Sequence, residues 1–275
     1  MADHQPLHIF IGWDGREAVA SYVAAHSIRK RTKATLSIEY LKHRELRKAG
    51  NFARPWLVDG ASGEFMDLID SRKFSTEFSH TRFLVPTLMK YQGWALFMDA
   101  DMLVLSDVDD LFALCDDKYA VMCVKHNHKP IESHKMDGRE QLQYYRKNWS
   151  SFVLWNCGHS ANKELTKERV NFMPGRDLHA FSWLDDSLIG TLPYTYNYIS
   201  SVSPPLPTNS AGFPAGKPKV IHYTEGGPWF EECKEVPYGG LWLEEYEDWQ
   251  SNGEHDSKIV QMATIAHEEM EEIRK

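Results

Sequence analysis

The chain has 275 residues and a formal net charge of −8, with 31 lysines and arginines against 39 aspartates and glutamates. Its apolar content of 42% and charged content of 25% are ordinary for a soluble globular protein, and its length suffices for one large α/β domain. A general nucleic-acid binder needs a basic face, so this charge argues against a nucleic-acid partner. An acidic protein that binds an anionic ligand needs a metal ion or a few well-placed cationic side chains.

Cysteine spacing and the N-terminal segment indicate the cellular compartment in which the protein is expected. The four cysteines form no C-x-x-C pair, so neither a zinc site nor a redox motif is indicated. The first six residues lack the basic region and apolar core of a signal peptide. No apolar run approaches the roughly 18 residues of a membrane span. We expect a cytoplasmic protein with reduced thiols and no transmembrane span.

The N-terminal segment predicts a first strand–helix unit. Residues 7–12 are an apolar run typical of a buried strand, and a Trp-Asp-Gly turn ends it. Apolar residues at helical spacing predict a helix over 16–30, and a second strand is predicted over 36–41. A strand, a Gly/Asp turn and a helix form the first unit of many nucleotide-binding sheets. Residues 44–78 are expected to be irregular.

The rest of the chain alternates between predicted strands and helices. We expect further strands over residues 94–98, 120–124, 151–155 and 219–223. We expect helices over residues 79–91 (interrupted at Pro86), 108–114, 162–171, 182–189 and 258–274. Loop and helix are expected over 125–149, and a proline-rich loop over 203–219. No boundary is marked, so residues 1–275 are predicted to be one α/β domain with a mostly parallel, Rossmann-like central sheet flanked by helices.

Two aspartates interrupt the apolar run 96–105. In an extended segment residues i and i+2 point to the same side, so Asp99 and Asp101 present oxygen ligands on one face. Such ligands suit Mg²⁺ or Mn²⁺ shared with substrate phosphates, and ligands of open α/β sheets bind at the carboxyl ends of strands. The alternative is an ordinary turn after a buried strand, where Asp is common. The apolar flanks favour the metal site.

His222 and Arg82 are further candidates for this site. His222 lies in the last predicted strand and would complete the coordination by Asp99 and Asp101. Mn²⁺ accepts an imidazole among oxygen ligands more readily than Mg²⁺, so Mn²⁺ is favoured. The alternative is a structural histidine. Arg82 pairs with a donor hydroxyl, a phosphate or a site carboxylate, or else forms a surface salt bridge of little energetic value.

Three other aspartates are candidates for contacts with a donor substrate. Asp14 follows the first predicted strand and either accepts hydrogen bonds from a base or ribose or caps the following helix. Asp185 and Asp186 are adjacent, so on a helix they point about 100° apart and cannot both face one atom. One of them approaches the sugar, and we favour Asp185.

Two other polar clusters are interpreted as solvated. His126, His128 and His134 have no carboxylate or cysteine at a ligand spacing, so a loop is favoured over a second metal site. An acidic group in the late region is read as a solvated face. It consists of Glu231, Glu232, Glu244, Glu245 and Glu247.

Several segments, in chain order, resemble glycosyltransferases of the GT-A fold. They are most similar to the retaining enzymes of family 8, which include glycogenin-like and bacterial galactosyl- and glucosyltransferases. The first strand and helix of that family resemble residues 9–14 and 23–27, and its metal motif resembles residues 97–101. Further matches are residues 81–83, 151–156, 183–186, 220–223 and 226–229.

The resemblance implies metal-dependent transfer of a hexose from a nucleotide-diphosphate sugar, usually linked to UDP, to an acceptor hydroxyl with retention. It implies metal ligation by Asp99, Asp101 and His222, and catalytic roles for Asp185, Asp186 and Arg82. The implied donor-binding residues are Gly12, Asp14, Arg16, Arg82, Asp99, Ala100, Asn156, Gly226 and Gly227. A nucleotide-binding half over 7–125 and an acceptor half over 126–250 are expected.

The resemblance leaves the acceptor open: a glycan, a lipid-linked sugar, a small metabolite or a protein. It also leaves open whether retention proceeds by front-face attack or through a covalent intermediate. A homodimer through the predicted terminal helix is a further expectation.

The chain departs from the family pattern at three positions. Glu17 stands where an aromatic residue often stacks on uracil, and Gly227 stands where a lysine commonly holds the diphosphate. The acidic segment reads Leu184-Asp185-Asp186 rather than Asp-Gln-Asp. These departures concern the base, the phosphate contacts and the carboxylate that faces the sugar.

Two alternative functions use the same aspartate pair. Phosphohydrolases of the haloacid dehalogenase type also place D-x-D after an apolar strand, but their motif usually opens the chain, and they do not account for His222. The other alternative is a non-catalytic nucleotide-sugar-binding domain, which the absent lysine and aromatic residue favour.

Overall fold

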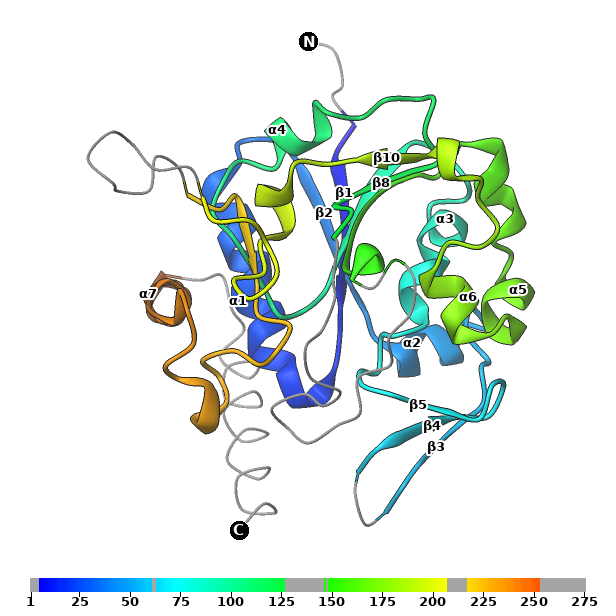
Figure 1. Cartoon of the computed structure of the whole chain (residues 1–275), viewed down its shortest axis with the longest axis horizontal. Coiled ribbons are helices and arrows are strands. Elements are labelled where there is room, and N and C mark those ends of the chain that lie inside the picture. Colours follow the sequence, from blue (N-terminus) through cyan, green and yellow to red (C-terminus); the bar gives the residue numbers. More distant parts are fainter. Residues whose placement is uncertain (1–4, 61–62, 127–145, 147, 207–216, 253–275) are drawn as a thin grey trace.

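The computed structural model describes residues 5–60, 63–126, 146, 148–206 and 217–252 (Figure 1). A six-stranded central sheet has the order β10-β8-β9-β6-β1-β2. Every neighbouring pair in it is parallel except the two pairs that β9 forms with β6 and β8. The prediction of a single α/β domain with a mostly parallel sheet is confirmed. The strands are β1 (Leu7–Gly12), β2 (Leu36–Leu41), β6 (Trp94–Met98), β8 (Val121–Cys123), β9 (Phe152–Asn156) and β10 (Ile189–Thr191).

Helices cover both faces of this sheet, which is why its central strands are apolar on both sides. The alternation of β1 sends Ile9 and Ile11 toward α1 (Ala18–Arg31) and Phe10 toward the opposite face. In Figure 1, α1 lies on one side of the sheet and α3, α5 and α6 lie on the other. The remaining helices are α2 (His43–Lys48), α3 (Val85–Leu88), α4 (Asp109–Phe112), α5 (Lys167–Phe172), α6 (Gly175–His179) and α7 (Gly239–Asn252).

Two smaller sheets complete the described fold. β7 (Met102–Val104) pairs antiparallel with β11 (Val220–His222), which joins the segment after the aspartate pair to the late histidine. Antiparallel strands β3 (Trp56–Val58), β4 (Phe65–Asp67) and β5 (Arg72–Phe74) form the other sheet. The expectation that residues 44–78 are irregular is therefore wrong.

Several predicted helices have other bounds. The segment predicted as a helix over 79–91 is a 3₁₀ turn over Thr81–Leu84 followed by the short α3. Pro86 lies in the first turn of α3 and does not interrupt it, because proline lacks only an N–H that has no partner there. Lys90 and Tyr91 then adopt positive φ angles, which ends the helix.

Two other helix predictions need correction, and one lies outside the described residues. Residues 162–171 divide into a 3₁₀ turn and α5, which Thr166 caps. Residues 182–189 contain only a 3₁₀ turn over Asp186–Leu188, and the edge strand β10 follows it directly. The predicted helix over 258–274 lies outside the described residues. Within the described ranges no helix has the length and apolar content that a membrane span requires.

Candidate active site

The carboxyl ends of three parallel strands bring the candidate residues to one edge of the sheet. Gly12 of β1 pairs with Leu41 of β2, and Ile11 pairs with Met98 of β6. The segments that follow these strands therefore lie side by side. β11 reaches the same edge from the opposite direction, because the backbone of His222 pairs with that of Met102.

Asp99, Asp101 and His222 converge at this edge. One ligand atom from each of the three side chains lies within 4.8 Å of the others. His222 is only 4% exposed, and its Nε2 lies 3.4 Å from Oδ1 of Asp101 and forms no hydrogen bond with any described residue. Two carboxylates and an imidazole nitrogen that makes no hydrogen bond within the described part of the chain form a set of ligands that fits a divalent cation.

Arg82 lies directly behind one of these ligands. Its Nη1 is 2.8 Å from Oδ1 of Asp99 and donates to the carbonyl of Ser150 over 3.0 Å. The side chain is 6% exposed, and its guanidinium lies over the rings of Phe78 and Phe97. Arg82 thus forms a buried ion pair with a site carboxylate, and the alternative of a surface salt bridge is wrong.

Asp14 serves the turn after β1. Its Oδ1 accepts from the backbone N–H of Arg16 at 2.9 Å and from Nε at 3.0 Å, and its Oδ2 accepts from Nη2 at 2.6 Å. Oδ2 also accepts from the backbone N–H of Glu77 at 3.1 Å. Both carboxylate oxygens are therefore engaged within the chain, which matches the capping alternative. Gly12 is required for packing, because a Cβ there would lie 2.5 Å from the ring of Phe78.

Glu77 and His43 are part of the same edge. Burial, and then the charge of Asp14, raises the pKa of Glu77 to about 7. Burial, and then the cationic Arg47, lowers the pKa of His43 to about 4. His43 Nε2 lies 3.5 Å from Oε2 of Glu77. The carboxyl of Glu77 therefore changes its charge near neutral pH.

We predict that Glu77→Gln stabilises the protein more at pH 8 than at pH 5. A pKa raised by folding adds stability at low pH that is lost as pH rises through the folded value. A rise from 4.5 to about 7 corresponds to roughly 3 kcal/mol at most, so a gain of about 1–3 kcal/mol is expected at pH 8. Urea unfolding at both pH values measures it, with the exposed Glu235→Gln as control. An equal effect of Glu77→Gln at both pH values would contradict the prediction.

Asn156 lies at the edge of the sheet opposite to Asp99. The prediction that Asn156 contacts the donor substrate is therefore corrected. β9 runs antiparallel to β6, and Asn156 pairs with Trp94 at the start of that strand. The side-chain amide of Asn156 donates to the carbonyl of Tyr119 over 3.2 Å. It is the beginning of β9, not its end, that reaches the site: the N–H of Asp99 donates to the carbonyl of Ser151 over 2.9 Å.

Asp185 and Asp186 are also placed away from the site. They directly precede β10, which runs parallel to β8 and therefore starts at the edge opposite to Asp99. Asp185 accepts from the N–H and hydroxyl of Ser187, and these hydrogen bonds lower its pKa. Asp186 is exposed and pairs with Arg146. The strand that follows this pair thus starts at the end of the sheet opposite to Asp99, and the roles predicted for the pair at the sugar stay predictions.

The two glycines after β11 shape a tight loop. Gly226 has a φ of +114°, and a Cβ there would lie 2.7 Å from Sγ of Cys233. A Cβ at Gly227 would lie 2.1 Å from the indole of Trp229. Both positions thus require glycine for local structure. Ala100 is fully buried between the two aspartates.

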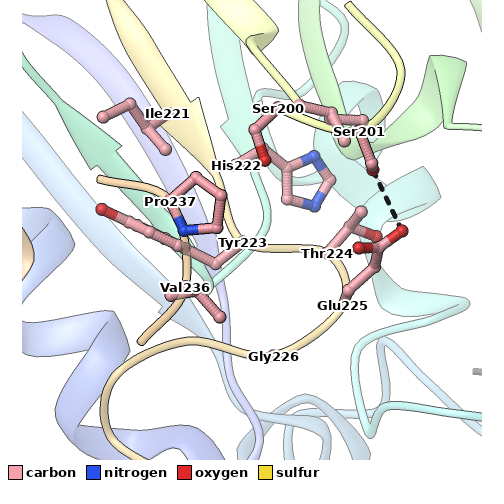
Figure 2. A pocket seen from close by; sticks show the side chains of 11 residues that line it. Ser200, Ser201, Ile221, His222, Tyr223, Thr224, Glu225, Gly226, Val236 and Pro237 are labelled. Atoms are coloured by element: carbon pink, nitrogen blue, oxygen red, sulfur yellow. Dashed lines mark hydrogen bonds between the residues drawn. The ribbon is translucent and has the colours of Figure 1, made fainter. Parts of the chain in front are cut away.

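A cavity opens beside His222 (Figure 2). Its polar wall includes the hydroxyl of Ser201, which donates to Oε1 of Glu225 over 3.0 Å. Figure 2 shows the imidazole of His222 on the side of this cavity toward Ser200 and Ser201. The cavity is lined by Ile199, Ser200, Ser201, Ile221, His222, Tyr223, Thr224, Glu225, Gly226, Val236 and Pro237.

A second cluster of possible metal ligands joins α1 to α7. It consists of His26, Glu245 and Asp248. Lys30 Nζ lies 2.8 Å from Asp248 and 3.6 Å from Glu245, and Arg31 lies 2.6 Å from the other oxygen of Glu245. These cations already balance both carboxylates, so the cluster is an ion-pair network. Glu245 is 3% exposed, so its assignment to a solvated face is wrong.

Four polar residues around the site were not among the predicted site residues. Ser150 and Ser151 stand before β9, Asn197 lies between two tyrosines, and His179 ends α6. All four lie behind the candidate ligands rather than among them. Of the histidine cluster predicted as a loop, only His126 lies within the described residues, and it is buried.

A family model for glycosyl transferase family 8 matches residues 8–233. The chain belongs to glycosyl transferase family 8. It is 42% identical over 256 residues to Protein CDI of Arabidopsis thaliana, covering 93% of this chain and 92% of that protein. The family assignment sets aside the phosphohydrolase alternative: the protein is a glycosyltransferase.

Solved structures of glycosyltransferases share the fold of this family 8 enzyme. The bifunctional WbbM matches with a TM-score of 0.59 and 16% identity, over 95% of this chain and 52% of the WbbM chain. LgtC, a galactosyltransferase solved with donor and acceptor sugar analogues, matches with a TM-score of 0.51 and 15% identity, over 89% of this chain and 99% of its own. GlyE of Streptococcus pneumoniae TIGR4 matches with a TM-score of 0.53 and 13% identity, over 90% and 64%. The present chain spans about half of the WbbM chain. The matches to these structures confirm the predicted GT-A fold.

Proposed function

We propose that this family 8 enzyme transfers a hexose from a UDP-linked sugar to an acceptor hydroxyl, with Mn²⁺ and with retention at the anomeric carbon. The observation that carries the proposal is the convergence of Asp99, Asp101 and His222 at the carboxyl edge of the sheet. This is the edge at which open α/β sheets bind ligands. UDP and a hexose are what the family resemblance implies.

The three ligands and Arg82 have distinct tasks in this proposal. Asp99, Asp101 and His222 would hold the ion, which when bound neutralises the diphosphate that leaves the sugar. The imidazole favours Mn²⁺ over Mg²⁺. Arg82 orients Asp99, because its buried guanidinium forms an ion pair with that carboxylate.

The nucleotide portion of the donor would lie along the edge formed by the ends of β1 and β2. Arg16 and Glu77 are among the partly exposed polar side chains there, and Arg16 is fixed by Asp14 and lies 4.7 Å from the ring centre of Phe65. Glu17 stands where the family resemblance places an aromatic residue that stacks on uracil, so the guanidinium of Arg16 is proposed to contact the base or a phosphate instead.

The acceptor would approach His222 from the side on which Ser201 and Glu225 lie. The hydroxyl and the carboxylate of these two residues suit the hydroxyl groups of a sugar-like acceptor. Asp185 and Asp186 precede a strand that starts at the edge opposite to Asp99, which argues against a covalent sugar intermediate on either of them. We therefore favour front-face attack, in which a diphosphate oxygen of the donor takes the proton of the acceptor hydroxyl.

A thermal-shift panel of nucleotides and nucleotide sugars, with and without Mn²⁺, tests this function. A ligand at 100 times its dissociation constant stabilises by about 2.7 kcal/mol, so a shift of roughly 5–10 °C is expected for UDP-sugars with Mn²⁺. Slow Mn²⁺-dependent release of UDP from the same sugars, followed by mass spectrometry, should accompany it. Equal shifts with and without the metal would contradict the metal-dependent part of the proposal. Binding without any release or transfer would favour the non-catalytic alternative.

A further inference from the structure

Asn197 lies behind His222 and contacts the ring nitrogen that does not face the aspartates. Oδ1 of Asn197 is 2.9 Å from Nδ1 of His222. The amide Nδ2 of the same residue is 2.9 Å from Oγ of Ser151. Asn197 is fully buried, so water does not substitute for either contact. The histidine is therefore tied to the turn that precedes β9.

The hydrogen-bond directions along this chain are determined by a backbone carbonyl. The Ser151 hydroxyl donates its only proton to the carbonyl of Asn148 over 2.7 Å. It must then accept from Asn197, which turns the amide nitrogen toward the serine and the amide oxygen toward His222. An amide oxygen only accepts, so Nδ1 of His222 carries the proton. In the neutral ring Nε2 then presents its lone pair toward Asp101.

The same turn also supports the other side of the site. The carbonyl of Ser151 accepts from the N–H of Asp99, and the carbonyl of Ser150 accepts from Arg82, which pairs with Asp99. The hydroxyl of Ser150 is 2.7 Å from Nδ1 of His179 on α6. Residues 150 and 151 thus contact Arg82 and the backbone of Asp99 on one side, and Asn197, which contacts His222, on the other.

We propose that Asn197 is a positioning residue that holds His222 as the Nδ1-protonated tautomer, so that Nε2 is free to bind a metal ion. The proposal rests on the metal-dependent function proposed above. Partners that fix the tautomer and orientation of a metal-ligating histidine typically contribute 10–100-fold to metal affinity. Asn197 contacts no substrate in this proposal and acts only through His222 and Ser151.

Titration of Mn²⁺ alone, followed by electron paramagnetic resonance of the free ion, tests this role. Asn197→Leu keeps a similar branched shape and removes both hydrogen bonds, so a roughly 10–100-fold weaker affinity is expected. Asn197→Asp keeps the acceptor for Nδ1, and the serine hydroxyl can turn its proton to the new carboxylate, so affinity should stay within a few-fold of wild type. Equal affinity of wild type and Asn197→Leu would overturn the proposal.

A matched control separates this role from a loss of folding. Asn162 is also fully buried, and its amide donates to the carbonyls of Ala120 and Asn156 over 2.7 and 2.8 Å, away from the site. Asn162→Leu should destabilise the fold as Asn197→Leu does and leave the Mn²⁺ affinity of the folded protein unchanged. A parallel loss of affinity in both variants would reduce Asn197 to a structural residue.

Nitrogen-15 chemical shifts of the His222 ring provide a readout that needs no metal. The wild-type ring, when neutral, should show a protonated Nδ1 and an unprotonated Nε2, and Asn197→Leu should lose this preference. A protonated Nε2 in the wild type would overturn the proposal. Failure of the wild type to bind Mn²⁺ would instead count against the proposed function, and the ring shifts would still decide the role of Asn197.

Discussion

Asp101→Asn should abolish the Mn²⁺-dependent part of nucleotide-sugar binding. The change removes one negative charge from a group of three ligand atoms that lie within 4.8 Å of one another and leaves the side-chain shape nearly unchanged. Even residues that only orient metal ligands contribute 10–100-fold to affinity, so loss of a charged ligand should weaken Mn²⁺ binding by more than about 100-fold. Isothermal titration with Mn²⁺, and thermal shift with UDP-sugars plus Mn²⁺, measure the loss.

The exposed Asp110→Asn is the matched control for this prediction. It makes the same chemical change on α4, in an exposed position outside the three-ligand cluster. It should leave the affinity and the melting temperature unchanged. If Asp101→Asn bound Mn²⁺ within a few-fold of wild type, Asp101 would not be a ligand, and the ion would have to be held by other groups.

The three candidate metal ligands that the sequence predicted share one property: each is a polar residue at the end of an apolar strand. Asp99 and Asp101 follow β6, and His222 ends β11. For a parallel strand the position of its carboxyl end follows from the fold class alone, which is why the two aspartates reach the expected edge. His222 pairs with Met102, and this pairing joins segments that lie far apart in the sequence. Local sequence pattern does not predict such a pairing, and the candidate role of His222 came from the family resemblance.

The predictions that failed did so because local sequence does not determine the direction of a strand or its partner in the sheet. Asn156 ends an apolar strand in the same way as Met98, but β9 is antiparallel, so its end lies at the opposite edge. Asp185 and Asp186 were expected on a helix near the sugar, and an edge strand begins three residues after Asp186. A three-residue strand is too short to show a periodicity that distinguishes it from a helix.

Buried charges were misread for a related reason. Glu245 lies in an acidic segment typical of a solvated face, and its partners on α1 are more than two hundred residues earlier in the chain. The supporting residues Asn197, Ser150 and Ser151 are likewise polar residues of ordinary type, and only the three-dimensional contacts reveal what they hold. The sequence therefore predicted the three candidate ligands and Arg82, but not Asn197, Ser150 and Ser151, which support them.

Arg82→Met should be the most damaging single substitution at the site. It removes the guanidinium that lies 2.8 Å from Asp99 and leaves that carboxylate in a largely buried position without its cation. Breaking a buried ion pair in this way costs about 3–5 kcal/mol, which corresponds to a melting temperature lower by roughly 10 °C. Mn²⁺ should restore part of this loss, because a bound cation replaces the missing charge beside Asp99. Thermal unfolding with and without Mn²⁺ measures both effects.

Arg54→Met provides the comparison that separates the site from general stability. Arg54 is fully buried and forms a two-point ion pair with Asp67, at 2.9 and 2.6 Å, outside the three-ligand cluster. Its replacement should cost a similar 3–5 kcal/mol. Mn²⁺ should then raise the melting temperature of Arg54→Met by the same amount as that of the wild type, and that of Arg82→Met by more. An equal gain in all three proteins would show that Arg82 does not act on the metal ligands, even if the losses of stability were as large as expected.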